Sequence, residues 1–282
     1  MERITLIAVF YNEEEKLPGY FRNVEGLFDE ILVVDCGSTD RSAAICTENG
    51  AKVFKSSVRY FENNVNTLID AAKDGWVFIL DADERLSSEL KGGIRKAVGE
   101  NKGYAAFGIN RREYLFNRFA NSGRLNLVPN VRLLRKGKFT YPSEPHSTPQ
   151  IHGETGLIKK GLILHYNLVS MPFYLQKLTR YLLDMPVEFA KAGNTKRVNI
   201  GERNSKISII FGKHGLRRLL LFPPVQVLNY LFRHRFIFDG MNGLAYSVGM
   251  GTYAFFEEAI WQDIEQKKEG KALDWKNEYP QE

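Results

Sequence analysis

Cysteine is almost absent from this chain, whose 282 residues include only Cys36 and Cys46. Two cysteines cannot supply a disulfide framework, and they suit a reducing compartment. Long apolar runs are also missing, because no run approaches the roughly 18 residues expected of a membrane-spanning helix. Met1-Glu2-Arg3 leads directly into a strand-like stretch, so we expect no secretory signal. These absences predict a cytoplasmic protein.

The glycine-rich phosphate signatures are missing as well. The sequence contains no GxxxxGK followed by Ser or Thr, and no GxGxxG follows the first predicted strand. The usual ATPase and dinucleotide-binding classes therefore lose support. Internal repeats and low-complexity tracts are also absent.

Basic residues exceed acidic ones by 39 to 33, which gives a net charge of +6 and a pI near 9.1. This balance favours anionic partners such as nucleic acid, phosphorylated substrates or an anionic membrane surface. An alternative of equal weight is that the positive net charge only keeps the protein soluble. The hydrophobic content of 44% is ordinary for a globular protein, and the length allows one large or two modest domains.

The first half of the chain alternates short apolar segments with helical patterns. This alternation predicts a mostly parallel sheet with helices on both faces. The predicted strands are 4–10, 30–35, 51–55 and 76–80, and the predicted helices are 18–28, 37–50 (after an initial turn) and 62–73. After residue 103 longer, half-exposed strands follow, then a helix over 171–190. We expect Pro223-Pro224 to break the following apolar run and the polar end from Glu257 to be a frayed tail.

Polar residues gather where the predicted strands end. Asn12 and Glu13 follow the first strand, Asp35 ends the second, and Asp81 and Asp83 follow the fourth. Ligands of such sheets bind at the carboxyl ends of the strands, so these residues predict one site. For Ser38, Thr39 and Asp40, which follow the second strand, helix capping is the favoured interpretation.

Asp81-Ala82-Asp83 places two carboxylates at i and i+2, on the same side of an extended chain. Such hard oxygen ligands suit Mg²⁺ or Mn²⁺ that shares its shell with substrate phosphates. The alternative is a helix cap made by Asp83 or Ser87. The acids on neighbouring strands favour the metal site, and we expect the cation that offsets these acids to arrive with the substrate.

Seven segments together resemble the family-2 glycosyltransferases, in particular bacterial enzymes that build lipopolysaccharide core and related envelope glycans. They are AVFYNEE, EILVVDCGSTDRS, GAKVF, WVFILDADERLSSEL, VRLLRKG, EPHSTP and LHYN. The resemblance covers most of residues 3–185 in order, and a looser similarity continues through FIFDGMNGL.

The resemblance implies an α/β, Rossmann-like GT-A fold: a mixed, mostly parallel sheet flanked by helices, with a C-terminal helical extension. It also implies a nucleotide-sugar donor, Mn²⁺ or Mg²⁺ at the Asp-x-Asp motif, and inversion at the anomeric carbon. Carried over by position, Asn12, Glu13 and Asp35 would hold the nucleoside, Asp81 would face the ribose and sugar, and Asp83 would ligate the metal.

Other positions depend on the resemblance more loosely. His165 ends an apolar run and matches the downstream histidine that completes the metal shell in many GT-A enzymes; a core or surface histidine is the alternative. Asn66 matches a donor-binding Asn of relatives, although the basic residue beside it is lost. Arg132 and Arg180 are candidates to meet the diphosphate or an acceptor phosphate, with surface solvation as the alternative.

Inverting transfer needs a carboxylate or imidazole within reach of the acceptor hydroxyl. Glu144 and His146, in EPHSTP, are the candidates for this catalytic role. Many relatives carry Glu after the histidine, whereas this chain departs from them with Ser147.

Together with the acids at the strand ends, the resemblance implies a metal-dependent inverting glycosyltransferase that moves one sugar from a nucleotide-diphosphate sugar, with a UDP-sugar favoured, to a glycan or lipid-linked acceptor of the bacterial envelope. The missing QxxRW pattern argues against a processive polymerase, and nucleic acid is not an expected partner. Two alternatives stay open. One is a sugar nucleotidyltransferase. Those enzymes usually carry a Gly- and Arg-rich loop after the first strand, and YNEEEK at this position of the chain resembles that loop poorly. The other is a non-catalytic nucleotide-sugar-binding protein.

We predict a GT-A catalytic domain over 1–170 and a helical region over 171–282 that packs on it. Residues 215–238 combine leucines and aromatics with arginines. This composition fits an amphipathic basic helix at the inner face of the cytoplasmic membrane, and it equally fits a helical cap on the catalytic domain.

Overall fold

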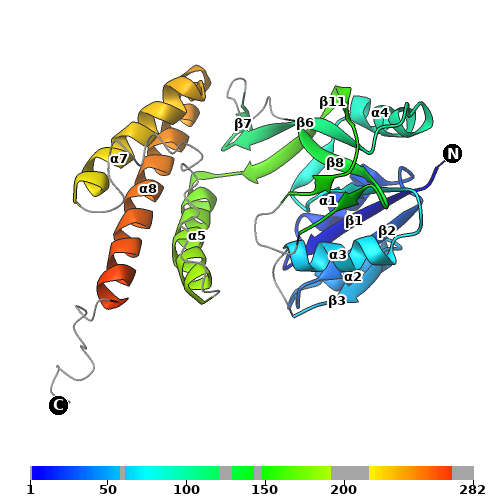
Figure 1. The fold of residues 1–282 in the computed structure, drawn as a ribbon, viewed down its shortest axis with the longest axis horizontal. Helices are drawn as coiled ribbons and strands as arrows, with labels where there is room; N and C mark the ends of the chain where they lie inside the picture. Colours follow the sequence, from blue (N-terminus) through cyan, green and yellow to red (C-terminus); the bar gives the residue numbers. More distant parts are fainter. Residues whose placement is uncertain (1, 58–60, 121–128, 143–147, 192–215, 269–282) are drawn as a thin grey trace, which may run out of the picture. The chain divides into compact units, whose positions relative to one another are not determined.

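The computed structural model describes residues 2–57, 61–120, 129–142, 148–191 and 216–268. The chain divides into two compact units (Figure 1). The first unit comprises residues 1–114 and 125–167, and the second comprises residues 115–124 and 168–282.

The first unit is built on a sheet in which the strands follow the order β3-β2-β1-β4-β8-β6-β11-β5. Strands β1, β2, β3 and β4 pair in parallel, whereas β8 is antiparallel to β4 and β6, and β5 is antiparallel to β11. These strands are β1 (Ile4–Phe10), β2 (Glu30–Asp35), β3 (Lys52–Lys55), β4 (Trp76–Ile79), β5 (Glu84–Leu86), β6 (Ala106–Leu115), β8 (Asn130–Arg135) and β11 (Thr155–Leu168). A small separate sheet pairs β9 (Phe139–Thr140) with β10 (Gln150–Ile151). The predicted mixed α/β sheet is confirmed.

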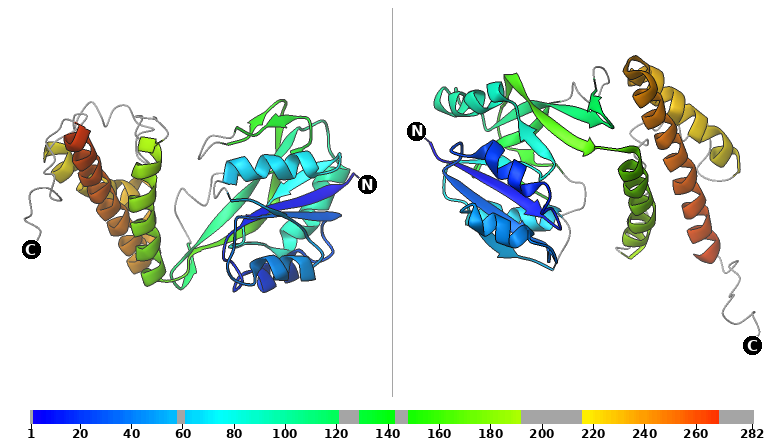
Figure 2. Two further views of the ribbon diagram at one scale, coloured as in Figure 1. Left: turned by 90° about the horizontal axis from the view of Figure 1, so that it is seen from below. Right: turned by 180° about the vertical axis from the view of Figure 1, so that it is seen from behind.

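Helices cover both faces of this sheet (Figure 2). The helices α1 (Leu17–Val24), α2 (Ser42–Glu48) and α4 (Ser88–Gly99) share one apolar cluster with Leu6 and Phe10 of β1. Helix α3 (Phe61–Ala71) shares a second cluster with Ile7. Because side chains alternate along a strand, β1 supplies both clusters and is almost completely buried between them.

Helix α1 ends four residues before the predicted end at Phe28. Gly26 has φ +69°, in the left-handed region that glycine tolerates, and this turn stops the helix after Val24. Helix α4 begins where Ser87 Oγ accepts a hydrogen bond from Leu90 N at 3.4 Å. Ser87 rather than Asp83 is therefore the cap in this segment.

The second unit contains β7 (Arg118–Phe119) and the helices α5 (Met171–Lys191), α7 (Leu216–Leu228) and α8 (Gly240–Lys268). A short π-helix, η2 (Asn229–Arg233), and a 3-10 helix, η3 (Phe236–Asp239), connect α7 to α8. The core of this unit gathers Leu115, Leu168, Tyr174, Phe236 and Tyr253. Among the described residues, no helix has both the length and the apolar character needed to cross a membrane.

Two expectations about this unit are wrong. Pro223 and Pro224 lie inside α7 and do not break it, because packing against α8 outweighs the backbone hydrogen bonds that proline cannot donate. The polar segment from Glu257 continues α8 to Lys268, and the rest of the predicted tail, residues 269–282, lies outside the described residues. Glu258 is buried and pairs with the buried Arg218 at 3.0 Å, so this polar sequence contributes to the helix contact.

Candidate functional site

The loops after β1 and β2 are joined at the carboxyl edge of the sheet. Phe10 lies beside Asp35 in the parallel register, so the two strands end together. Asn12 N donates to Ser38 Oγ at 2.9 Å, and Asn12 Oδ1 accepts from Thr39 N at 2.9 Å. Asn12 has φ +52°, a backbone conformation that Asn adopts more readily than most residues. Because Ser38 N in turn donates to Asp35 Oδ1 at 3.1 Å, the loop of Asn12 is fixed beside Asp35, which is 6% exposed.

Glu13 extends this edge toward the acids that follow β4. Its amide donates to Ser42 Oγ at 2.7 Å, and its carboxylate pairs with Lys16 Nζ at 2.5 Å. Burial raises the pKa of Glu13, although Lys16 opposes the rise and Asp83 adds to it. Ser38 and Ser42 therefore connect the two loops, whereas the sequence favoured helix capping for Ser38.

Asp81 and Asp83 lie in a tight turn and not in the extended chain that the i, i+2 spacing suggested. Glu84 N donates to Asp81 O at 3.0 Å, which closes the turn. Because the chain turns, the two carboxylates meet different partners: Asp81 Oδ2 accepts from Arg132 Nη2 at 3.0 Å, and Asp83 Oδ2 lies 3.4 Å from His165 Nε2.

Glu84 is the buried centre of this arrangement. It is the first residue of β5, and its side chain has no exposed surface. Its Oε1 lies 2.6 Å from Arg132 Nη2 and 3.4 Å from Arg111 Nη1, and its Oε2 accepts from Asp81 N at 3.1 Å. Burial raises the pKa of Glu84, and the arginines counteract this rise. The protein's own arginines thus supply the countercharge that we expected to arrive with the substrate.

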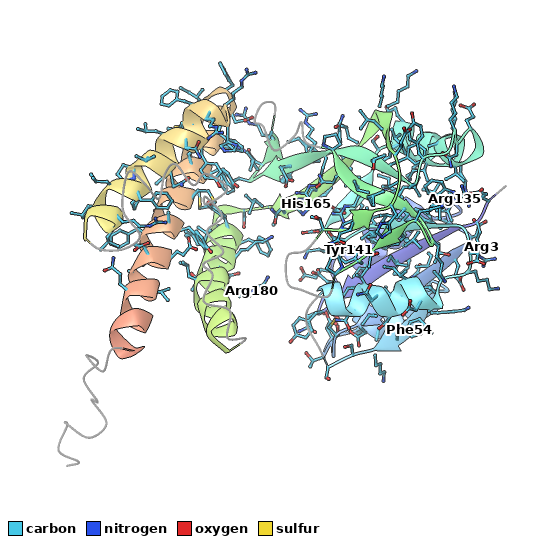
Figure 3. The ribbon with its side chains drawn as sticks, viewed as in Figure 1. Arg3, Phe54, Arg135, Tyr141, His165 and Arg180 are labelled. Carbon is cyan, nitrogen blue, oxygen red and sulfur yellow. The ribbon has the colours of Figure 1, made fainter. Side chains whose placement is uncertain are left out.

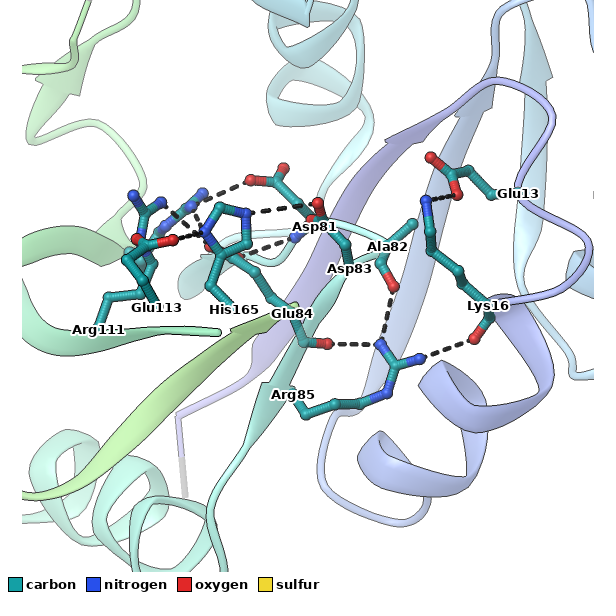
Figure 4. Close-up of polar contacts among 11 residues, drawn as sticks. Glu13, Lys16, Asp81, Ala82, Asp83, Glu84, Arg85, Arg111, Glu113 and His165 are labelled. Carbon is teal, nitrogen blue, oxygen red and sulfur yellow. Dashed lines mark hydrogen bonds and ion pairs between the residues drawn. The ribbon is translucent and has the colours of Figure 1, made fainter. Parts of the chain in front are cut away.

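His165 joins the carboxylates of two elements (Figure 4). It lies on β11, paired with Glu84 across the antiparallel register (Figure 3). Its Nδ1 lies 2.6 Å from Glu113 Oε2 on β6, and its Nε2 faces Asp83. Burial lowers the pKa of His165, but the hydrogen bonds to Asp83 and Glu113 outweigh burial and raise it to about 9.

Arg85 fastens the turn to the loop after β1. Its guanidinium donates to Ala82 O and Lys16 O, each at 2.8 Å, and it lies over the Tyr20 ring. Two loops that bear predicted site residues are therefore held side by side by one half-buried cation, which sequence spacing gave no means of finding.

Asp83 and His165 are the described residues that best fit a divalent cation. Carboxylate oxygen and imidazole nitrogen are both ligands of Mn²⁺. Glu113 holds the other ring nitrogen, as partners of metal-bound histidines do. Within the described ranges, however, no group of three or more His, Cys, Asp or Glu side chains could hold an ion. The pair is thus at most a partial shell that substrate oxygens and water would complete.

The remaining predicted residues have different positions. Asn66 lies on α3 and donates to Tyr141 O at 3.0 Å, and Tyr141 adds to the electrostatic environment of Arg132. Arg180 lies on α5, in the second unit (Figure 3). Glu144 and His146, the candidates for the catalytic base, lie outside the described residues.

The sequence did not single out Glu113 and Arg111, which complete the cluster. Arg111 Nε lies 2.8 Å from Glu113 Oε1, and both side chains are mostly buried. The available signal was their i, i+2 spacing on a predicted strand, which places them on one face. Burial raises the pKa of Glu113, but the interactions with His165 and Arg111 outweigh burial and lower that pKa below its ordinary value.

Comparison with known proteins gives a consistent result. The family model described as glycosyl transferase family 2 matches residues 5–164. The lipopolysaccharide core biosynthesis glycosyltransferase LpsC of Rhizobium meliloti is 24% identical over 263 residues, which cover 91% of this chain and 90% of that protein. An uncharacterized glycosyltransferase of Rickettsia typhi is 26% identical over 207 residues, 68% of this chain and 70% of its own length.

A solved structure of another protein resembles the fold over nearly the whole chain. The mannosyltransferase PcManGT of Pyrobaculum calidifontis, in complex with GDP-Man and Mn²⁺, has a TM-score of 0.50 and 12% sequence identity. The match covers 93% of this chain and 88% of that one. At this identity the similarity concerns the fold alone, and it agrees with the mixed sheet and C-terminal helices described above.

Proposed function

The chain belongs to glycosyl transferase family 2, and we propose that it is a metal-dependent, inverting enzyme that transfers one sugar from a nucleotide-diphosphate donor to an envelope glycan or glycolipid. The observation that carries this proposal is the chain of contacts Asp83–His165–Glu113 beside Asp81–Arg132. It follows β4, which pairs in parallel with β1, and Arg85 joins its turn to the loop after β1 that carries Asn12.

The reaction creates negative charge on the leaving nucleoside diphosphate as the acceptor hydroxyl attacks the anomeric carbon. When bound, Mn²⁺ or Mg²⁺ supplies countercharge to that diphosphate. Asp83 and His165 would hold the ion, and Glu113 would fix the ring of His165. Arg132 holds Asp81 toward the donor and remains protonated, because Glu84 and Asp81 raise its pKa despite burial. Glu144 and His146 stay predicted candidates for the base.

Two observations on other proteins support the finer points. PcManGT binds GDP-Man together with Mn²⁺, which supports a nucleotide-sugar donor and a divalent cation here. LpsC acts in lipopolysaccharide core biosynthesis, which supports an envelope acceptor. A lipid-linked acceptor would place the enzyme at the inner face of the cytoplasmic membrane. We favour a UDP-sugar as donor, with GDP- and dTDP-sugars as outcomes of the test.

Thermal unfolding with UDP, GDP or dTDP, each with and without Mn²⁺, tests donor and metal together. A ligand at about 100 times its Kd stabilises the protein by about 2.7 kcal/mol. We expect Asp83→Asn to abolish the Mn²⁺-dependent increment and Asp74→Asn, at an exposed site, to retain it. If no nucleotide shifts the transition of the wild type, the proposal is wrong.

A turnover assay separates the remaining alternatives. A transferase releases nucleoside diphosphate from the donor sugar, slowly with water as the acceptor and faster with the correct acceptor. A nucleotidyltransferase would instead release pyrophosphate from a nucleoside triphosphate and a sugar phosphate. Nucleotide binding without either product would identify a non-catalytic binding protein.

A further inference from the structure

Helix α7 and the π-helix that follows it expose large apolar side chains along one stripe. Leu221, Leu228 and Phe232 are 45%, 53% and 60% exposed, at spacings of seven and four residues. These spacings place the three side chains on one side of the helical segment. Isolated exposed leucines are ordinary on protein surfaces, but a continuous stripe indicates an interface.

Helix α8 carries a second stripe of the same kind. Met241, Leu244 and Val248 follow at spacings of three and four residues and are 75%, 40% and 47% exposed. In the short helix η3 between the two stripes, Phe238 is 71% exposed. Helices α7 and α8 pack along each other (Figure 1), and we call the exposed side chains of α7, η2, η3 and α8 together the hairpin surface.

The small residues of this hairpin face inward. A Cβ added at Gly243 would collide with Phe236 O, and a Cβ added at Gly251 would collide with Val227 Cγ2. Ser247, halfway between the two glycines, is completely buried. Large apolar residues such as Phe222, Phe236 and Tyr253 are buried in this unit as well, so the exposed stripes are additional to its core.

The charges at the hairpin favour an anionic partner. Residues 216–256 contain one acidic residue, Asp239, which has no exposed surface. Arg218 is also buried and is neutralised by Glu258. The exposed charges of η2 and the turn after it come from Arg233 and Arg235. The hairpin surface therefore combines apolar side chains with exposed cations, and residues 216–256 add no exposed acid to it.

We propose that the hairpin surface binds the interface of an anionic lipid bilayer, with α7 and α8 lying in the plane of the membrane. An in-plane orientation fits exposed apolar side chains that follow one another along each helix. Phe238 and Met241 would enter the boundary between headgroups and acyl chains, and Arg233 and Arg235 would meet lipid phosphates. This inference deepens the membrane location that rests on the proposed function, and its test is read separately from donor binding.

Co-sedimentation of the full-length protein with vesicles is the test. We expect binding to phosphatidylcholine vesicles that contain phosphatidylglycerol, and weaker binding to phosphatidylcholine alone or at high salt. Phe238→Ser/Met241→Ser should weaken binding at least about tenfold, because two large apolar groups no longer enter the membrane. Leu157→Ser, which changes a 43% exposed side chain of the first unit, is the matched control and should bind as the wild type does.

Arg233→Gln tests the electrostatic part of the proposal. It should weaken binding about fivefold on anionic vesicles and leave binding to phosphatidylcholine unchanged. Each variant is also tested for the thermal shift with UDP and Mn²⁺, which the hairpin variants should retain. A wild type that binds anionic vesicles but shows no thermal shift with any nucleotide would overturn the proposed transferase site and not the hairpin surface.

Three results would overturn the membrane proposal. One is a wild type that fails to bind anionic vesicles. Another is unchanged binding by Phe238→Ser/Met241→Ser. The third is a dimer in sedimentation analysis that these substitutions convert to a monomer, with no lipid binding, since a second copy of the chain would then cover the hairpin surface.

Discussion

Glu84 carries a charge that the folded protein cannot hydrate. Its side chain is completely buried, and Arg132 and Arg111 lie 2.6 and 3.4 Å from its Oε1. An ion pair of this kind adds little net stability compared with an apolar pair, but losing one partner leaves an uncompensated buried charge. We therefore expect the loss of Arg132 to destabilise the protein more than the loss of Arg135, a more exposed arginine of the same strand.

Arg132→Gln should therefore destabilise the protein by about 3–5 kcal/mol. Arg135→Gln, also on β8, is the matched control. The side chain of Arg135 is 40% exposed and pairs with the exposed Glu2 at 3.1 Å, so its loss should cost about 0–1 kcal/mol. Urea unfolding measures both values. Equal effects of the two substitutions would contradict the role given to Glu84.

Glu113 acts on the candidate metal site through His165. Its carboxylate lies 2.6 Å from Nδ1 and so directs Nε2 toward Asp83. Removing such a partner commonly lowers metal affinity by about 10–100-fold. We expect Glu113→Gln to lower Mn²⁺ affinity in the presence of UDP by this factor, measured by calorimetric titration. Glu100→Gln, at an exposed helix end, should leave the affinity unchanged.

The sequence located the acids at the strand ends better than it located their partners in the structure. Asp35 ends β2, Asp81 and Asp83 follow β4, and parallel strands bring their carboxyl ends to one edge. Glu113 and Arg111 come from β6, which pairs with β8 and lies beside β11. Such antiparallel pairings depend on long-range register, and the alternation of residues along one strand does not reveal its neighbour.

At the scale of elements, the strands were predictable and the helix ends were not. Strands β1 and β2 have the predicted bounds because short β-branched apolar runs have few other conformations. Helix α7 was mispredicted because its prolines are tolerated only in the context of its partner α8. The helix propensities of the residues in α7 give no information about its contact with α8.

Two glycines inside helices allow the effect of helix propensity on stability to be distinguished from the effect of packing. A Cβ added at Gly92 of α4 would have no atom within 4 Å, whereas one added at Gly251 of α8 would lie against Val227 and Pro223. Gly92→Ala should stabilise the protein by about 0.5–1 kcal/mol. Gly251→Ala should destabilise it by about 1–3 kcal/mol, because the added methyl forces α7 and α8 apart. Scanning calorimetry measures both, and stabilisation by Gly251→Ala would show that this helix contact is wrong.

At the scale of the molecule, the two units have separate cores. Both large apolar clusters of the sheet consist of residues in the first unit, and the cluster around Tyr174 and Phe236 consists of residues in the second. The described site residues Asp81, Asp83, Arg132 and His165 all belong to the first unit. The hairpin surface belongs entirely to the second. Donor binding and membrane binding should therefore be separable.

A chain shortened to residues 1–170 tests this separation. We expect it to fold, because it keeps both clusters that bury the sheet, and to retain the thermal shift with UDP and Mn²⁺. It should not bind anionic vesicles. In the shortened chain Leu115 and Leu168 no longer pack against Tyr174 and Phe236. The shortened chain therefore also carries Leu168→Ser, which limits association through the newly exposed apolar surface. Phe238→Ser/Met241→Ser in the 282-residue chain is the control. It changes two side chains of the hairpin surface and keeps the helices, so its vesicle binding shows whether the surface or the whole second unit is needed. A shortened chain that folds, by circular dichroism, yet shows no nucleotide shift would mean that the second unit contributes to the donor site.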